Sequence, residues 1–531
     1  MTGQAHKAIG VRPRIKYEAN PLIPPLSWQA TLDFANRELA VIHGQYVETH
    51  NTFFVEGVWD GPFCQGGLDR VENVFGSGCT VRGETVVFVP SSATTDSLFY
   101  TATPSELMVS NSLPLLLARI GDSLDPKVPV YEDLNNSIMR GIDGYAEVIP
   151  TRRSSVRRLM YHNMEVGGVG PTRVEKPLPP HFSCYADYVS YLRSVYGRLI
   201  ENARDQGRAK ALKIYSTQSR GYDSTAVNVI AAPHGIDRVF TVTKSKGIGR
   251  YALEDENHQG NDDGTEICQI LNVPSQPIDR RAFTKVFEDE TLLNAGVHQS
   301  QDANLIEIRN YIEPPCILLT GTLGEMWYTS KCIPSNRKPL INDQLMRWDL
   351  SCHGMSELRL GYGFIQAPLP FIGARRRAEI HRITESAEMI PWRLDNNYDR
   401  PIPRRLGEEA GIPRSFFGQE KMASVVEVPQ PQVPIGKELR RDFWEFLISN
   451  GLRTPLSLKA VPAVQAFNKA VIFAGPVGRY KLIYYLGRAV DRLSRGRHSL
   501  GLLWEDLNAS FYVFCVNRVV EEYRRYLRPQ T

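Results

Sequence analysis

The 531-residue sequence lacks any long apolar run, and this absence excludes an ordinary membrane-spanning helix. Such a helix needs about 20 consecutive apolar residues, and no run of even about 18 occurs. The first residues, MTGQAHKAIGVRPRIKYE, lack the apolar centre of a secretory signal, so we expect none. Lysine and arginine number 62 against 58 aspartates and glutamates, a net charge of +4. Without a basic excess, we expect neither nucleic acid nor a membrane as partner.

The eight cysteines include no CxxC pair, which argues against a structural zinc site and against a disulfide framework. We therefore expect reduced thiols and a cytoplasmic location. Hydrophobic residues make up 42% of the chain and charged residues 23%, as in ordinary globular proteins. A chain of this length is too long for one hydrophobic core, so we expect two or more domains.

Short β-like runs dominate the sequence from Leu32 to about Pro150 and predict stacked antiparallel sheets. The clearest runs are 52–55, 85–89, 97–101 and 107–110. Leu113 to Ile120 predicts a short helix, and residues 1–30 are expected to form an irregular arm.

The segment GGVGPTRVEKPLPP, residues 167–180, predicts a linker because Gly and Pro interrupt it and no apolar period survives. We place a domain boundary there, which divides the chain into residues 1–180 and 181–531. Apolar residues at spacings of three and four then predict a helix from about Val189 to Ala203.

The stretch IYSTQSRGYDSTAVNVIAA, residues 214–232, predicts a strand, a turn of small polar residues and a helix. Gly221 lets the backbone approach an anion, and the hydroxyls of Ser219 and Ser224 offer it hydrogen bonds beside the free N–H groups of the helix start. Asp223 adds a carboxylate, which suits a divalent cation that bridges it to the anion. The alternative is an ordinary turn in which Asp223 or Ser224 caps the helix.

The spacing Ser-x-Gly-x-Asp-Ser resembles the SGGxDS pyrophosphate loop of the N-type ATP pyrophosphatases, whose best-known amidating members are the asparagine synthetases. The resemblance implies that 181–531 is an α/β, parallel-sheet ATP-pyrophosphatase domain with a helical tail. Arg220 stands where the family has its first glycine, and it either adds a cation to the phosphate site or crowds the loop. The run from Arg238 predicts a second strand, and the family places adenine near its end, which makes Val242 and Thr243 candidate adenine neighbours.

The order of the runs before Pro150 is similar to the N-terminal half of an asparagine synthetase, a glutamine-hydrolysing Ntn domain with αββα layers. The similar segments are EGVWDGPF at 56–63 and SELMVSNSLPLLLA at 105–118. Members that hydrolyse glutamine need a cysteine after the initiator Met, because its free amine is the general base for the thiol. Thr2 occupies that position here. We therefore expect a retained structural shell, as in the β-lactam synthetase branch, and no glutaminase activity.

A third predicted strand, CILLT at 316–320, leads into GTLGEMW, where the family reads LLTGDGGDE. Aligning the shared LTG places Gly321 in the nucleotide site. It also places Glu325 at the aspartate that shares Mg²⁺ with the loop aspartate, here Asp223, and glutamate is an acceptable oxygen ligand. Thr322 replaces the family's first aspartate. A plain strand-to-helix cap is the alternative for this segment.

Two further segments resemble the catalytic part of the family. SCHGMSELR at 351–359, followed by APLPFI, is similar to ExRxPFLD, and in the β-lactam synthetase branch the matching glutamate belongs to a Tyr–Glu base pair. Glu357 is therefore a candidate base or orienting residue, with a surface Glu/Arg pair as the alternative. IPRSFFGQEK at 412–421 resembles the segment whose lysine reaches the α-phosphate, which makes Lys421 a candidate for neutralising charge. A solvated lysine is the alternative.

The resemblance implies a ligase that uses ATP and Mg²⁺ to adenylate a carboxylate, after which an amine displaces AMP and an amide forms. The implied substrates are a small-molecule or peptide carboxylate and an amine, in specialised metabolism, and a homodimer is left open. One alternative is an intramolecular cyclase of the β-lactam synthetase or lasso-peptide macrocyclase type. The other is a nucleotide-binding pseudoenzyme, which the substitutions Thr2, Arg220 and Thr322 favour.

Overall fold

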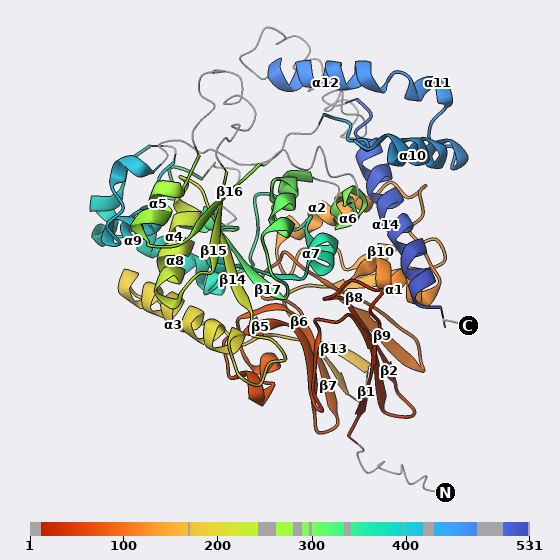
Figure 1. Cartoon of the computed structure of the whole chain (residues 1–531), viewed down its shortest axis with the longest axis horizontal. Coiled ribbons are helices and arrows are strands. Elements are labelled where there is room, and N and C mark those ends of the chain that lie inside the picture. The colour runs from red at the N-terminus through yellow and green to blue at the C-terminus, as the bar shows by residue number, and fades with distance from the viewer. Residues whose placement is uncertain are drawn as a thin grey trace, which may run out of the picture.

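The computed structural model shows an α/β protein in which a pair of β-sheets is followed by a parallel sheet and a helical tail (Figure 1). The structure describes residues 12–167, 170–242, 262–279, 289–296, 300–333, 341–396, 398–417, 429–474 and 503–528. No helix in these described ranges combines the length and hydrophobicity that crossing a membrane requires.

The first sheet of the N-terminal unit has seven strands in the order β1-β3-β2-β9-β8-β11-β10. All neighbours are antiparallel except β1 and β3, which are parallel. The strands are β1 (Arg14–Ala19), β2 (Trp28–Asp33), β3 (Glu38–His43), β8 (Leu98–Ala102), β9 (Glu106–Ser110), β10 (Val148–Pro150) and β11 (Ser155–Leu159). Residues 14–19 and 28–30 therefore belong to strands, which corrects the predicted irregular arm.

The second sheet has six antiparallel strands in the order β13-β12-β7-β6-β5-β4. Its strands are β4 (Glu48–Thr49), β5 (Phe53–Trp59), β6 (Val74–Arg82), β7 (Thr85–Val89), β12 (Asn163–Gly167) and β13 (Gly170–Val174). Strand β13 lies inside the segment predicted to be a linker, so the connection to the second unit begins only after Val174.

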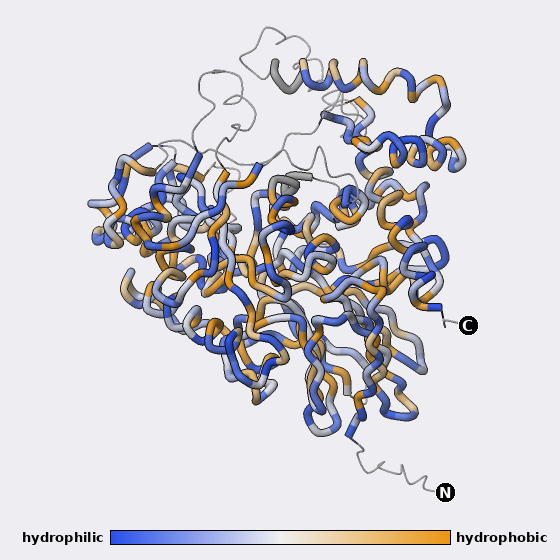
Figure 2. Tube along the Cα trace, viewed as in Figure 1, coloured by the Kyte–Doolittle hydropathy of each residue, from blue (hydrophilic) through white to orange (hydrophobic). Residues whose placement is uncertain are grey.

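The two sheets enclose a shared hydrophobic core, which confirms the predicted stacked sheets. Strand β3 shows the alternation that places side chains there: Leu39 and Val41 are buried, whereas Ala40 between them is exposed. Trp28 packs edge-on against Phe54, with ring centroids 5.0 Å apart. Hydrophobic residues follow the strands of this unit, and its outer loops are largely hydrophilic (Figure 2).

The second unit contains a five-stranded parallel sheet in the order β16-β15-β14-β17-β18. Its strands are β14 (Lys213–Gln218), β15 (Arg238–Val242), β16 (Ser275–Ile278), β17 (Cys316–Thr320) and β18 (Phe364–Pro368). The chain starts at β14, builds outward to β16, and then returns to build β17 and β18 on the other side. The strand order therefore reverses between β14 and β17, where open α/β sheets have a crevice at the carboxyl ends of their strands.

Helices cover both faces of this sheet, and strand β17 (CILLT) is buried along its whole length. Adjacent residues of β14 point to opposite cores: Ile214 joins the side of α3 and α4, and Tyr215 joins the side of α6 and α7. The helices of this unit are α3 (Tyr185–Ala203), α4 (Tyr222–Ala231), α5 (Thr265–Ile270), α6 (Glu290–Gly296), α7 (Ser356–Tyr362), α8 (Arg377–Glu385) and α9 (Pro401–Glu409).

The C-terminal tail is helical, as predicted, and it returns to the first unit (Figure 1). Helix α14 packs against α6 and against α1 of the first unit, and the side chain of Asn517 bonds both the N–H and the carbonyl of Leu124. The remaining helices are α1 (Leu113–Ile120), α2 (Tyr131–Asn136), α10 (Lys437–Ser449), α11 (Pro455–Leu458), α12 (Val461–Ala474) and α14 (Asp506–Tyr526).

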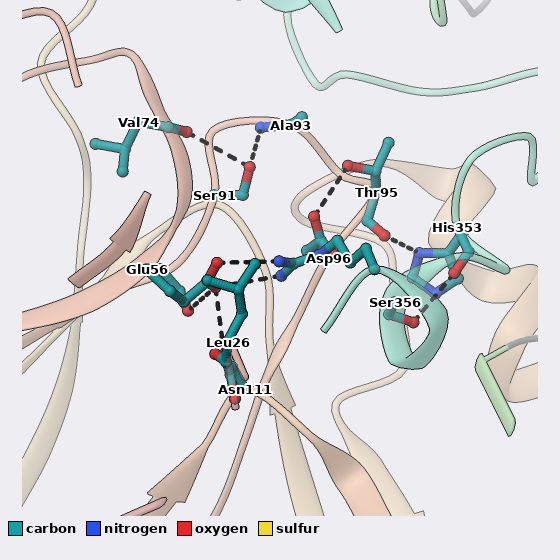
Figure 3. A network of polar contacts seen from close by, with 12 residues as sticks. Leu26, Glu56, Val74, Ser91, Ala93, Thr95, Asp96, Asn111, His353 and Ser356 are labelled. Atoms are coloured by element: carbon teal, nitrogen blue, oxygen red, sulfur yellow. Dashed lines mark hydrogen bonds and ion pairs between the residues drawn. The ribbon is translucent and has the colours of Figure 1, made fainter. Parts of the chain in front are cut away.

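A buried ionic network also joins the two units. Arg359 of α7 donates from Nη1 to Glu56 Oε2 at 3.0 Å and from Nε to Asp96 Oδ1 at 2.7 Å. Asn111 Nδ2 adds a bond to Glu56 Oε1 at 3.3 Å, and His353 Nδ1 meets the carbonyl of Thr95 at 2.9 Å. Figure 3 shows Glu56 and Asn111 on one side of Asp96 and the later segment that carries His353 on the other. Because these groups are buried away from water, the network fixes the position of α7 against the two sheets of the N-terminal unit.

Candidate functional site

The loop between β14 and α4 lies where the strand order reverses. Strand β14 ends at Gln218 and α4 begins at Tyr222, so residues 219–221 make the turn. Gly221 is the N-cap of α4 and has extended backbone. The start of α4 at Tyr222 places Asp223 and Ser224 in the first turn of the helix. The first N–H groups of an α-helix have no intrahelical acceptor, and this helix starts at the carboxyl end of the strands, where open α/β sheets bind their ligands.

Hydroxyl groups hold the loop in a compact bend. Ser219 Oγ accepts the N–H of Gly221 at 3.0 Å and lies 3.0 Å from Ser224 Oγ. Ser224 Oγ accepts the N–H of Ser219 at 3.1 Å, and Thr225 Oγ1 donates to the carbonyl of Gly221 at 2.9 Å. Serine and threonine hydroxyls thus hydrogen-bond to backbone N–H and carbonyl groups of the loop and hold its conformation.

Arg220 is directed to the neighbouring helix α5. Its Nη2 donates to Glu266 Oε2 at 3.0 Å, and its backbone N–H donates to Asp262 Oδ1 at 3.0 Å. Asp263, next in sequence, accepts the N–H of Thr265 at 3.0 Å at the start of α5. The carboxylate of Asp262 thus accepts a hydrogen bond from an amide of the loop.

The segment after β17 meets the loop, as the alignment predicts. A Cβ built on Gly321 would lie 2.8 Å from Asp223 Cβ, and one on Gly324 would lie 2.1 Å from Asp223 Cγ. Both positions therefore require glycine for the two segments to approach this closely. Thr322 lies between them, with its hydroxyl 3.2 Å from Thr320 Oγ1.

Arg400 is the residue that sequence reasoning missed. It is the N-cap of α9, its side chain is 1% exposed, and its Nη1 forms an ion pair with Asp223 Oδ1. The guanidinium lies 4.1 Å from the ring centroid of Tyr328 and 5.2 Å from that of Tyr398. Burial lowers the pKa of Arg400 to about 9, so it remains charged at neutral pH. Pro401 at the first helical position was the one local signal, because it marks a helix start.

Glu325 lies in the short 3-10 helix η8 (Gly324–Trp327) that follows the glycine segment. Burial and the neighbouring Asp349 raise its pKa, whereas Arg377 and Arg347 lower it. The strongest charged neighbours of Glu325 are thus these three residues, and Asp223 is paired with Arg400. Within the described residues, no three His, Cys, Asp or Glu side chains cluster closely enough to hold a metal ion. The sharing of Mg²⁺ by Asp223 and Glu325 stays a prediction.

Glu357 is fully buried between the units. Its Oε2 accepts a hydrogen bond from Ser112 Oγ, the N-cap of α1, at 2.9 Å. Burial raises the pKa of Glu357 to about 8, while Ser112 and Arg359 lower it. These contacts are to the first unit, so the structure places Glu357 in the interface beside Arg359, and its catalytic role stays a prediction.

Of the other residues singled out from the sequence, Val242 lies in the described part of the chain and three do not. Val242 is the last residue of β15, and its side chain joins the core that contains Phe240 and Ile278. Thr243, Lys421 and Thr2 lie outside the described residues.

A scan of the sequence against protein-family models gives no match, and a search among curated proteins finds no relative. The functional argument therefore depends on the geometry of the crevice and on the motif resemblance.

Proposed function

We propose that the crevice between the loop at 219–224 and the segment at 321–324 binds the phosphates of ATP. The observation that carries the proposal is the reversal of strand order between β14 and β17, which brings both segments together at the carboxyl ends of parallel strands. The serine-rich turn and the first-turn amides of α4 supply donors suited to phosphate oxygens. An ATP-pyrophosphatase domain behind an Ntn-like sandwich is the arrangement that fits these features.

The activity we propose is an AMP-forming amide ligase of the asparagine synthetase type that does not hydrolyse glutamine. A carboxylate oxygen of the substrate bonds to the α-phosphorus of ATP as the bond to the diphosphate breaks. The amine nitrogen then bonds to the acyl carbon, the bond to AMP breaks, and the amine loses a proton to a base. The hydroxyls of Ser219 and Ser224 hold the leaving diphosphate, and Lys421 and Glu357 remain candidates by resemblance.

A nucleotide-binding pseudoenzyme is the second candidate, and the ion pair between Asp223 and Arg400 favours it. In that pair, Arg400 binds the carboxylate of Asp223, which aligns with the aspartate that binds Mg²⁺ in the family that the loop resembles. Such a protein would bind ATP in the crevice without transferring the adenylyl group.

Exchange of labelled diphosphate into ATP, measured with the full chain and a panel of carboxylic acids, tests the proposal. We expect exchange that depends on the acid, and we expect the double variant Ser219→Ala/Ser224→Ala to lose at least about tenfold, since two hydrogen-bonding groups are removed. Ser449→Ala, at an exposed position on α10, is the matched control and should exchange like the wild type. ATP binding without exchange would establish the pseudoenzyme, and absence of both would refute a nucleotide site.

A further inference from the structure

Two buried arginines, one helical turn apart, lie against the first turn of α4. Arg400 is the N-cap of α9 and Arg404 lies in its first turn, with exposures of 1% and 0%. Helices α4 and α9 pack together, and Arg400 pairs with Asp223 while Arg404 Nη2 bonds the hydroxyl of Tyr222. Spacing of four residues puts both guanidinium groups on the same face of α9.

Several N–H donors of these two guanidinium groups make no hydrogen bond to the described residues. Within the described residues, Nε of Arg400 and both Nε and Nη1 of Arg404 are buried without a hydrogen-bond partner. Leaving buried charged donors unpaired is costly, and native proteins rarely do so without a functional reason. The unpaired groups adjoin a helix start that is already suited to an anion.

The surrounding carboxylates do not bond to these unpaired donors. Among the described residues, Asp223 is paired with Arg400, and the charged groups that act on Arg404 are Arg414, Glu408 and Asp399. Glu408 is engaged by Arg414, whose Nε donates to it at 2.7 Å. Asp399 accepts the N–H of Leu394 at 3.0 Å and that of Asp395 at 3.3 Å. Three guanidinium groups therefore face three carboxylates, so this side of the loop offers a phosphate unpaired guanidinium N–H donors and no net excess of positive charge.

Aromatic side chains fix both arginines in place. Arg400 stacks on Tyr328 and Tyr398, and Arg404 lies 4.9 Å from the ring centroid of Tyr222. Tyr222 is itself packed against Tyr398, with centroids 5.2 Å apart. A Cβ built on Gly221 would lie 3.6 Å from the Tyr398 hydroxyl, which places this aromatic group directly under the turn. The arginines are thus preorganised beside the loop, as rigid phosphate-binding forks are.

We propose that Arg400 and Arg404 form the cationic side of the phosphate site and bind the diphosphate part of the ligand. This inference deepens the proposed function and rests on the crevice being a phosphate site. In the free protein, Asp223 occupies Arg400, and an incoming diphosphate replaces that carboxylate. The protein's positive charge at the phosphates then comes from guanidinium groups, and not from a metal ion shared by Asp223 and Glu325.

The test is calorimetric binding of inorganic diphosphate to the full chain without nucleotide, in EDTA and in Mg²⁺. We expect saturable binding in EDTA, weakened at least about tenfold by Arg400→Lys and by Arg404→Lys, because lysine keeps the charge but loses the planar fork. Arg405→Lys is the matched control: Arg405 is adjacent but pairs with Glu409 at 2.7 Å, and it should bind like the wild type.

Asp223→Asn provides a second variant that needs no buried arginine to be replaced. It removes the carboxylate that competes for Arg400, so diphosphate binding in EDTA should tighten several-fold. Weaker binding by this variant, or unchanged binding by correctly folded Arg400→Lys and Arg404→Lys, would overturn the inference. If exchange fails with every acid while arginine-dependent diphosphate binding persists, the ligase is refuted and this site stands. If exchange occurs and the arginine variants bind normally, the ligase stands and this site is refuted.

Discussion

Arg359 holds two buried carboxylates, Glu56 and Asp96, across the junction of the two units. We expect Arg359→Met to lower the free energy of unfolding by about 3–5 kcal/mol, because both anions would remain buried without a counter-charge. Urea denaturation followed by circular dichroism measures the change. Arg382→Met is the control, since that side chain is 74% exposed and should shift stability by less than about 0.5 kcal/mol. Equal midpoints for the two variants would contradict the account.

Glu357 makes stability depend on pH. Its folded pKa of about 8 is above the ordinary glutamate pKa of 4.5, so the folded state keeps a proton that the unfolded state releases. The contribution of Glu357 to the free energy of unfolding is therefore most favourable below about pH 4.5 and is lost progressively as pH rises toward 8. Between pH 5.5 and 7.5, Glu357→Gln should gain about 2 kcal/mol relative to the wild type, at about 1.4 kcal/mol per pH unit. Parallel pH profiles of urea midpoints would show that Glu357 ionises normally.

The residues of the loop were predictable because a short motif carries them, whereas Arg400 and Arg404 were not. Ser219, Gly221 and Asp223 are neighbours in sequence, so their spacing alone indicates a common site. Arg400 reaches Asp223 across 177 positions, the difference between 400 and 223, and no local pattern encodes that contact. Its role follows only from the packing of α9 on α4.

The contact between the loop and the segment after β17 depends on the absence of a side chain at Gly324. We expect Gly324→Ala to separate the two segments, because the new methyl group would lie 2.1 Å from Asp223 Cγ. The cost is about 1–3 kcal/mol of stability, with a matching loss of ATP affinity, measured by thermal melting and calorimetry. Gly167→Ala is the control, since a Cβ there meets nothing within 4 Å. Equal behaviour of the two variants would argue against a closely packed crevice.

The sequence predicts buried helices and strands better than it predicts strands at the edge of a sheet. The helix Leu113–Ile120 and the strand Cys316–Thr320 have the predicted bounds, because continuous apolar runs with clear flanks specify them. Strand β13 was mistaken for part of a linker because it contains Gly170 and Pro171. It is an edge strand, and edges tolerate proline because one side of the strand needs no ladder bonds.

The two units should unfold together. The buried Arg359 network and the packing of α14 on both α1 and α6 connect the two units. Unfolding of one unit would therefore break contacts that stabilise the other. We expect differential scanning calorimetry of the full chain to show one cooperative transition, and Arg359→Met to lower its midpoint as a single peak. Two resolved transitions in the wild type would show that the interface contributes little.

The most direct test of the central claim is hydrogen–deuterium exchange of the full chain with and without ATP. If the crevice holds the nucleotide phosphates, ATP should slow exchange several-fold in peptides that cover 219–224 and 321–324. Peptides from strand β12 of the sandwich should exchange at the same rate in both states. Protection confined to other regions, or no protection at saturating ATP, would contradict the assignment of the phosphate site.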